Sequence, residues 1–142
     1  VVQVPGSAWR LKAGAFVQAL EDREFQSHIL RYVHAMIIQL AQTSVAQSKA
    51  TLGIRLARWL LMCNDRVRDN QIPLTHDLVA DMLGTRRAGV TVALHELEGE
   101  GLIRSKRCLV EVLDRAGLEQ KAGDFYGDPE AQYQRLFPAC LI

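Results

Sequence analysis

The chain has 142 residues, of which 49% are hydrophobic, and its formal net charge is +1. This length suits one compact domain or a small domain with an extension, and the apolar fraction excludes wholesale disorder. The near-neutral charge argues against a sequence-blind polyanion binder, although a local basic face remains open. The longest apolar stretch is interrupted by His34, Gln39 and Gln42, short of the ~18 continuous residues of a membrane span, so we expect no membrane partner.

The cysteines argue for a reducing compartment. Cys63, Cys108 and Cys140 are odd in number and widely spaced, without a CxxC pair, which is typical of reduced cytoplasmic thiols. The four histidines complete no ligand set with them, and no secretion signal opens the chain. We therefore expect a cytoplasmic protein without a metal site.

The N-terminal stretch VVQVPGSAWRL predicts short strands over residues 1–4 and 8–12 around a Pro5-Gly6 turn. Residues 13–22 are expected to form a short helical or turn-rich segment. Because no Met opens the chain, we expect it to begin inside a larger protein with an upstream domain.

A long helical pattern begins at Glu24 and predicts a helix over residues 24–50. Its apolar seam follows a spacing of three and four, as in a coiled coil, through Leu30, Val33, Ile37, Leu40 and Ser44. The seam either packs on the core of its own domain or forms a dimer interface. We favour the dimer, because little upstream sequence is available to cover so long a helix.

Thr51 is expected to cap a second helix. Its apolar face comprises Leu52, Leu56, Trp59, Leu60, Cys63 and Val67, with Arg55, Arg58 and Arg66 off that face. Residues 65–73 are charged and turn-rich and predict a loop.

The next segment predicts a helix-turn-helix. Thr75 caps a helix over 76–83, Gly84 ends it, and Thr85 caps a second helix over about 86–99. The second helix is expected to bury Val90, Ala93, Leu94 and Leu97.

The remainder predicts a wing. Residues 101–103 enter a strand, 104–107 form a polar basic crossing, and 108–113 return as a second strand. Asp114 is expected to cap a helix over 115–122, and the tail from Gly123 is expected to be loosely ordered, with one helical turn around 132–136. The predicted fold is mainly α: a long dimerisation helix followed by a winged helix-turn-helix with a small β-hairpin.

Arg86 and Arg87 lie where the second helix of this motif would begin. Cations at a helix N-terminus cost about 0.3–1 kcal/mol each, whereas a bidentate arginine contact to guanine discriminates by about 1–3 kcal/mol. The alternative is a solvated pair, or ion pairs with Glu96 or Glu98, which lie too far along the helix. We therefore expect at least one of these arginines to contact DNA.

Other residues support this interpretation. The candidate DNA-binding residues are Thr75, His76, Thr85, Arg86, Arg87, Thr91, Lys106 and Arg107. His76 is nearly as compatible with an ordinary exposed histidine, and the hairpin-tip cations with a tip that has no partner. Residues 75–115 carry six Lys and Arg and seven Asp and Glu, a net charge of −1, so the DNA-facing positive charge is local. Gly89 indicates either a close approach to a neighbour or the DNA backbone, or neutral drift.

Catalysis has little support in the sequence, which lacks GxSxG, P-loop and HExxH motifs. Asp77, Asp81 and the glutamates at 96, 98 and 100 are interpreted as surface charge. We therefore expect no enzyme activity, although catalytic residues in an upstream domain remain a weaker alternative.

The segments IRLARWLL and LTHDLVADMLGTRRAGVTVALHELEGEGLI, followed by a hairpin, resemble the Crp/Fnr superfamily of bacterial transcription regulators over about residues 24–122. The resemblance implies a homodimer with a dimerisation helix over 24–50 and a winged helix over 51–122 that binds a palindromic promoter site. Residues 1–23 would be the remnant of an N-terminal effector domain, a β-roll, and 123–142 a C-terminal tail. The implied partners are double-stranded DNA, a second copy of the chain and RNA polymerase.

The resemblance also implies roles for single residues. Arg87 matches the base-reading arginine, Arg86 a phosphate-contacting neighbour, and Thr75 and His76 the phosphate-contacting start of the first helix. Thr51 falls near the hinge that joins the dimer helix to the DNA-binding domain.

The chain departs from the family pattern at two positions, since Ala88 stands where Glu is common and Val92 where a second Arg is common. The best-known half-site of the family is therefore not inferred. We expect no cofactor in this chain, and any effector, a cyclic nucleotide or another ligand, to bind the upstream domain. The main alternative is a winged-helix module for protein–protein contact.

Overall fold

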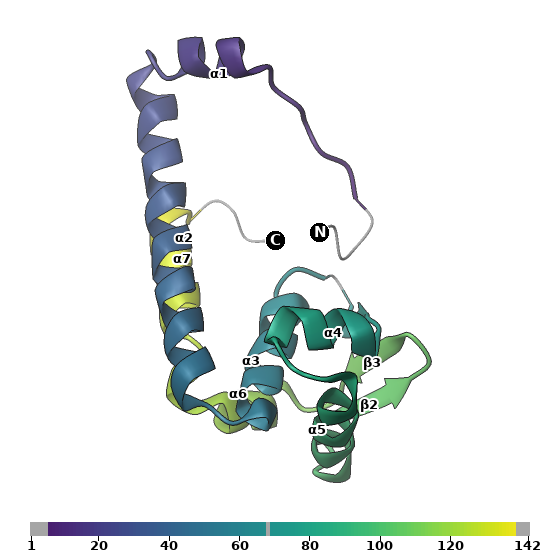
Figure 1. Cartoon of the computed structure of the whole chain (residues 1–142). Coiled ribbons are helices and arrows are strands. Elements are labelled where there is room, and N and C mark those ends of the chain that lie inside the picture. The colour runs from purple at the N-terminus through teal and green to yellow at the C-terminus, as the bar shows by residue number, and fades with distance from the viewer. Residues whose placement is uncertain (1–5, 68, 139–142) are drawn as a thin grey trace.

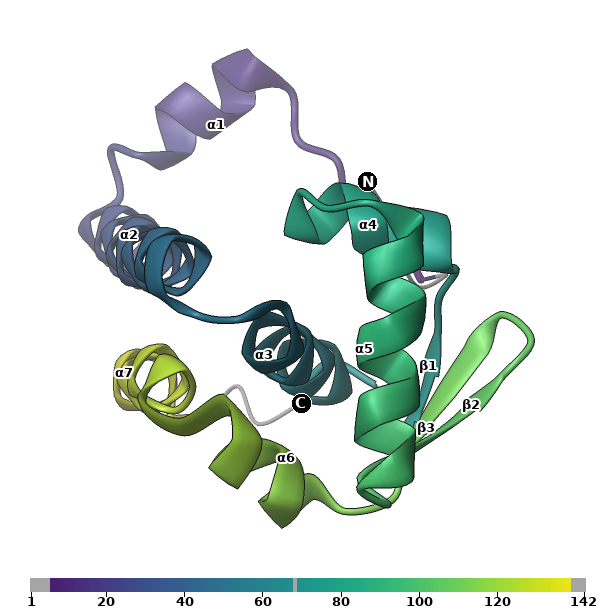
Figure 2. The same ribbon diagram turned by 60° about the horizontal axis from the view of Figure 1, so that its bottom comes forward.

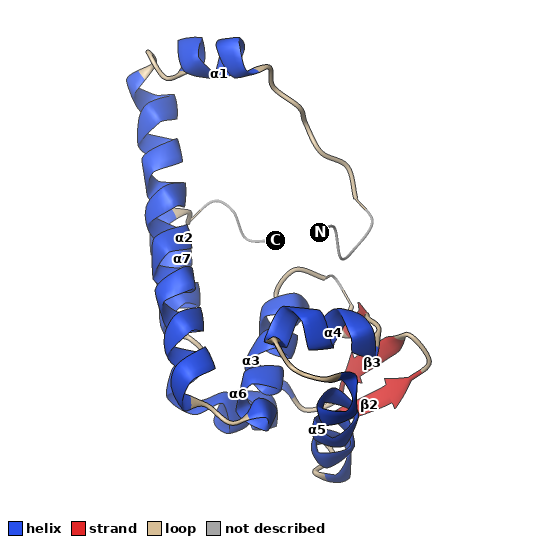
Figure 3. Ribbon diagram, in the orientation of Figure 1, coloured by secondary structure: helices blue, strands red, loops and turns tan. Residues whose placement is uncertain are grey.

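The computed structural model describes residues 6–67 and 69–138. Within them, helices dominate and a small antiparallel sheet lies at one edge, as the sequence predicts (Figure 3). The helices are α1 (Ala13–Ala19), α2 (Arg23–Lys49), α3 (Leu52–Asn64), α4 (His76–Leu83), α5 (Arg87–Gly99), α6 (Arg115–Ala122) and α7 (Asp128–Leu136), with a 3-10 turn η1 (Gly123–Phe125). The strands are β1 (Gln71–Pro73), β2 (Ile103–Lys106) and β3 (Leu109–Val112).

The long helix α2 stands as a rod beside the compact domain formed by α3 to α6 and the sheet (Figure 1). Asp22 caps it by accepting a hydrogen bond from Phe25 N at 2.8 Å. The prediction of a strand over 8–12 is wrong, because residues 6–12 are irregular; a strand needs a paired neighbour for its backbone groups. The strand predicted over 1–4 lies outside the described residues.

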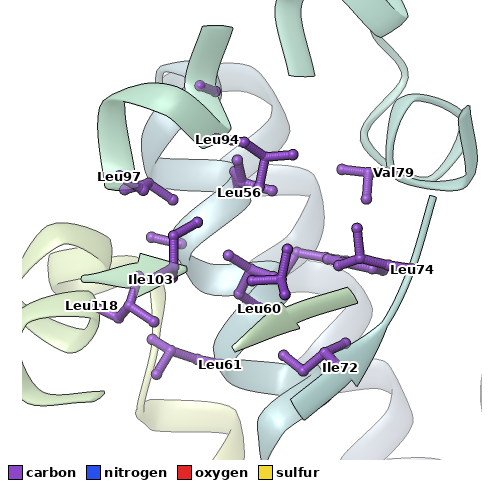
Figure 4. Packing of buried hydrophobic residues seen from close by; sticks show 14 of the residues in the cluster. Leu56, Leu60, Leu61, Ile72, Leu74, Val79, Leu94, Leu97, Ile103 and Leu118 are labelled. Carbon is purple, nitrogen blue, oxygen red and sulfur yellow. The ribbon is translucent and has the colours of Figure 1, made fainter. Parts of the chain in front are cut away.

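The core of the compact domain is built around α3. Leu56, Leu60 and Leu61 are fully buried there, and α5, α6 and the sheet close around them (Figure 4). Full burial of such a side chain stabilises the fold by about 1.5–3 kcal/mol. The predicted stripe of α5 is confirmed, because Val90, Ala93, Leu94 and Leu97 are all buried.

The sheet has the order β1-β3-β2, antiparallel throughout. The loop predicted over 65–73 therefore ends in a strand, whose Pro73 is tolerated because β1 is an edge strand. The basic stretch predicted as a crossing is mostly strand. Lys106 pairs with Leu109, so only Arg107 and Cys108 make the turn. The hairpin of β2 and β3, here called the wing, projects from the domain (Figure 2).

The C-terminal segment, here residues 123–138, is ordered, contrary to the prediction of a loose tail. α7 runs beside α2 in both views (Figures 1 and 2). Pro129 stands in its first turn and the Glu130 carboxylate accepts a hydrogen bond from Gly127 N at 2.9 Å, which stabilises the helix start. These local signals in GDPE were present in the sequence, but the contact with α2 was not visible there.

Across the described residues, none of the helices combines the length and apolar character needed to cross a bilayer.

Candidate nucleic-acid interface

The turn between α4 and α5 has a defined geometry. Thr75 caps α4 as predicted, by accepting from Leu78 N at 3.2 Å. Gly84 ends the helix in the left-handed region at φ 59°, which a residue with a side chain adopts only with strain. Thr85 N donates to Ala80 O at 2.9 Å and Gly84 N to Asp81 O at 3.3 Å, the pattern of a Schellman motif. The second helix is thus held at a fixed angle to the first.

The prediction that Thr85 caps α5 is wrong. Thr85 N–H is used to close α4, and the N-cap of α5 is Arg86, which has extended backbone and makes no side-chain capping hydrogen bond. The first amide groups of α5 therefore point outward without a capping oxygen, and both Arg86 and Arg87 are exposed beside them. Helix dipole and guanidinium charges add up at one place, which is suited to an anionic partner.

Arg87 forms a weak, exposed ion pair with Asp77. Its guanidinium lies 3.7 Å from Asp77 Oδ2, and the two side chains are 67% and 69% exposed. An ion pair this exposed contributes about 0–1 kcal/mol, so a stronger acceptor can displace it. Sequence reasoning placed Asp77 among ordinary surface charges and missed this contact; its signal was the position of Asp77 in the first turn of α4, close to the start of α5.

His76 and Thr91 connect the two helices. His76 Nδ1 lies 2.9 Å from Thr91 Oγ1, and this hydroxyl donates to Arg87 O at 3.2 Å. When Thr91 donates in this way, Nδ1 of His76 is the donor to Thr91, and Nε2 is left for an outside partner. The pair fixes the start of α4 against the second turn of α5, next to Arg87.

The wing carries its positive charge in two environments. Glu111 Oε2 lies 3.6 Å from Arg104 NH1 and 3.4 Å from Lys106 Nζ, so these cations share one acid across the hairpin. Arg107 is exposed at the turn, where Cys108 has a positive φ of 59°. Arg107 is therefore better placed than Lys106 to meet a phosphate.

Glu98 positions the wing relative to α5. Its Oε1 accepts a hydrogen bond from Ser105 N in β2 at 2.8 Å. Glu100 forms an ion pair with Lys121 of α6. Both glutamates are predicted to be plain surface charge. Glu100 is exposed, in agreement with that prediction, whereas Glu98 is partly buried and its carboxylate joins α5 to β2.

Gly89 lets α5 approach α3. A Cβ at this position would lie 3.1 Å from Leu52 Cδ2 and 3.4 Å from Thr85 Oγ1. The structure thus supports the close-neighbour interpretation, with Leu52 of α3 as the neighbour.

Two buried or half-buried arginines of α3 join the compact domain to α2. Arg58 is only 5% exposed; its Nε donates to Phe125 O at 2.8 Å and its NH2 to Thr43 Oγ1 at 3.1 Å. Burial lowers its pKa, an effect that the nearby Glu130 opposes. Arg55 NH1 donates to Leu83 O at 3.1 Å, the last residue of α4, and Gln47 of α2 donates to the same carbonyl at 3.0 Å. Sequence reasoning placed both arginines on a polar face.

A second network fixes the C-terminal segment to the end of α3. Tyr126 OH donates to Asp65 Oδ2 at 2.7 Å, and Arg115 NH2 donates to Asp65 Oδ1 and to Tyr126 OH, both at 2.8 Å. Burial, and then the hydrogen bond and charge of Asp65, raise the pKa of Tyr126. The segment from η1 onward is thereby tied to both α3 and α2.

The predicted seam of α2 is uncovered. Leu30, Val33, Ile37 and Leu40 are 62%, 45%, 58% and 60% exposed. The opposite face carries Ala35, Gln42 and Ala46, and there Gln42 Nε2 donates to Asp124 O of the C-terminal segment at 2.8 Å. Within residues 6–67 and 69–138 the seam therefore does not pack on the rest of the chain, because α7 and η1 occupy the other side of the helix.

Among residues 6–67 and 69–138, no group of three or more His, Cys, Asp or Glu side chains is placed to hold a metal ion.

Comparisons with known proteins agree with this geometry. The family model of the Crp-like helix-turn-helix domain matches residues 54–121. The chain is 32% identical to the transcriptional regulator LdrP of Thermus thermophilus, over 83% of this chain and 68% of that protein. It is 31% identical to LdrP of a second strain of the same species, over the same shares of the two chains.

Solved structures extend the comparison. A CRP-family transcriptional regulator from Thermus thermophilus superposes with a TM-score of 0.62 at 28% identity, over 72% of this chain and 56% of that one. A crp/fnr-family structure from Eubacterium rectale shares the fold, with a TM-score of 0.59 at 22% identity, over 78% of this chain and 51% of that one. The chain thus spans about half the length of these solved proteins.

Proposed function

Because the chain belongs to the Crp family of transcriptional regulators, we propose that it binds a palindromic promoter site as a homodimer, with the start of α5 in the major groove of each half-site. The observation that carries the proposal is the exposed pair Arg86 and Arg87 at a helix start that no side chain caps. This is the end of a recognition helix that meets base edges.

Arg87 is the proposed base reader. Its planar guanidinium can donate to O6 and N7 of guanine together, a contact that discriminates by about 1–3 kcal/mol. Leaving Asp77 costs at most about 1 kcal/mol, because that ion pair is exposed and long. The balance therefore favours the base over the acid.

Phosphate contacts position the helix in this proposal. Arg86 beside the amides of α5 and Arg107 at the turn of the wing supply positive donor groups. His76 adds a donor at Nε2 in its imidazolium form, in which both ring nitrogens carry a proton and Nδ1 still donates to Thr91. The other candidates are less available to a phosphate, because each already has a partner within the fold. The hydroxyls of Thr75 and Thr91 make hydrogen bonds, and the backbone of Thr85 closes the turn after α4. Lys106 forms an ion pair with Glu111.

The homodimer is proposed from the uncovered seam of α2. Four apolar side chains at coiled-coil spacing, each 45% or more exposed, favour a matching helix as their partner. Two-fold pairing along α2 would present two copies of α5 to half-sites about 10–10.5 base pairs apart.

RNA polymerase is proposed as a further partner at the promoter, and an effector site is proposed upstream of this chain.

The central experiment starts from sites selected by the chain out of random duplex DNA. We expect affinities in the range of about 10⁻⁸–10⁻¹¹ M that fall steeply with salt. Arg87→Ala should weaken binding to the selected site about 5- to 150-fold and relax the preference at one base pair. The matched control is Arg135→Ala, which removes the same charge from the exposed side of α7.

The outcomes separate the candidate functions. Equal affinity and base preference in Arg87→Ala would remove its assigned role. Absence of any DNA retardation at micromolar protein and low salt would favour the protein–protein module instead.

The dimer is tested by sedimentation equilibrium. Ile37→Glu places a charge in the seam and should yield monomers with weakened site binding. His28→Glu adds the same charge to an exposed position one heptad before Ala35, on the opposite face, and should remain dimeric. A wild-type monomer at the concentrations that saturate the palindrome would contradict the proposed assembly.

A further inference from the structure

The outer face of α5 carries apolar side chains that the fold does not use. From residue 51 onward, three large apolar side chains of the described residues are exposed: Met82 at 46%, Val92 at 58% and Leu113 at 46%. Val92, the most exposed of them, belongs to the proposed recognition helix. Ala88, four residues earlier, is also exposed.

The position of these two residues follows from the helix. The buried stripe of α5 faces α3 and the sheet, so Ala88 and Val92, at i and i+4, lie together on the outward side. They are separated by about 6 Å along the axis, close to two base-pair steps of ~3.4 Å. His95, the next outward residue, lies 3.9 Å from Glu98 Oε2 and belongs to the end of the helix near the wing. The apolar pair therefore directly follows Arg87.

The chemistry of base edges selects one ligand for such a pair. Neither side chain can donate or accept a hydrogen bond, so pressing it against the amino group of cytosine or N7 of a purine would leave a polar group unpaired. Thymine alone presents a methyl group in the major groove. We propose that Val92, assisted by Ala88, selects thymine in each half-site by contacting its 5-methyl group.

This inference rests on the proposed function, because it requires α5 to enter the major groove. It adds a specificity that arginine cannot supply: a T·A pair within a few base pairs of the guanine read by Arg87. A half-site containing both contacts would be recognised by one hydrogen-bonding and one apolar reader on the same helix.

The test removes the methyl group alone. In the selected site, each thymine is replaced in turn by deoxyuridine, which keeps the base pair and lacks the 5-methyl group. We expect one or two positions in each half-site at which affinity falls by about three- to ten-fold, and little change at the others.

A second arm assigns the effect to the side chain. Val92→Ala should lose a similar factor on the thymine site and should no longer respond to deoxyuridine at the sensitive position. Leu113→Ala, which shortens an exposed apolar side chain outside α5, is the matched control and should keep the full deoxyuridine effect. Thermal denaturation checks that both variants fold, since the two side chains are on the surface.

The results distinguish two failures. If the chain shows no preference among DNA sequences, the proposed function fails and this inference with it. If it binds a selected site specifically but no thymine responds to deoxyuridine, or if the response persists in Val92→Ala, the proposed function stands and the thymine contact is overturned. A selected half-site without thymine near the critical guanine overturns it equally.

Discussion

Arginine occurs in two contrasting regions of this molecule. At the start of α5, Arg86 and Arg87 are exposed, and Arg87 has only a long ion pair with Asp77. At the junction of α3 with α2 and the C-terminal segment, Arg58 is 5% exposed and bonded to a carbonyl and a hydroxyl. The same residue type is available to a partner in one region and is consumed by the fold in the other.

The difference follows from how each guanidinium is solvated. A buried charge is tolerated only when hydrogen bonds replace water, and Arg58 has acceptors from two other elements. Arg87 keeps its water and therefore loses little when it exchanges Asp77 for another acceptor. Burial and hydrogen-bond partners, rather than charge, distinguish an arginine that stabilises the fold from one that is available to a partner.

The largest expected effect tests the buried side of this contrast. Arg58→Met removes the guanidinium and leaves Phe125 O and Thr43 Oγ1 without their donor. We expect the free energy of unfolding to fall by about 2–4 kcal/mol, measured by urea denaturation with tryptophan fluorescence. Base preference should stay unchanged, because Arg58 lies away from α5.

Arg66→Met is the control for Arg58, since Arg66 is exposed just beyond the same helix. It should change stability by less than about 0.5 kcal/mol. If Arg58→Met instead left stability intact and altered the selected DNA sequence, the division between the two regions would be wrong.

The same contrast separates the features that the sequence predicts from those that it does not. α4 and its caps, the buried stripe of α5, and α6 with its Asp114 cap were predicted, because capping and helical periodicity are written within a few neighbouring residues. The seam of α2 was equally readable. Such local patterns locate the exposed arginines but say nothing of distant partners.

The errors about distant contacts have a common cause. Arg58 bonds to a residue 67 positions away, and Gln42 to one 82 positions away, so neither contact leaves a trace in local spacing. The order of the C-terminal segment depends on those contacts, and it was therefore mistaken for a loose tail. Thr85 failed as a cap for a local reason: α5 begins at Arg87, one residue later than predicted, so Arg86 occupies the N-cap position.

A smaller effect concerns the network that ties the C-terminal segment to α3. Tyr126→Phe removes the hydroxyl that donates to Asp65, and we expect a loss of about 1 kcal/mol near neutral pH. Because the pKa of Tyr126 is raised in the folded protein, its contribution is present below the ordinary tyrosine value of about 10 and is lost as pH rises through the folded value.

The stability difference between wild type and Tyr126→Phe should therefore narrow above about pH 10. Both proteins are measured by denaturant titration from pH 7 upward in a Cys63→Ala background, because burial raises the pKa of the Cys63 thiol to about 11 and this group titrates in the same range. If the stability difference between the two proteins stayed constant as the pH rose above about 10, the pKa of Tyr126 would not be raised by folding.

The smallest expected effect tests the exposed side. Asp77→Asn keeps the shape of the side chain but removes the negative charge that lies 3.7 Å from Arg87. The freed guanidinium and the lost repulsion of phosphate should raise affinity for non-specific DNA at low salt by a factor of about 2–5, in keeping with an exposed pair worth about 0–1 kcal/mol. Specific affinity should rise at least as much, because wild-type Arg87 must leave Asp77 to reach its base and the variant has no such ion pair to break.

Asp81→Asn removes the same charge from an exposed position nearer the end of α4 and should leave non-specific binding nearly unchanged. Fluorescence anisotropy over a series of salt concentrations separates the two variants, because the gain at Asp77 should fade as salt screens it. Equal gains in both variants would mean that net charge alone sets the affinity. A gain confined to Asp77→Asn would mean that this acid limits how readily Arg87 binds DNA that lacks its preferred base.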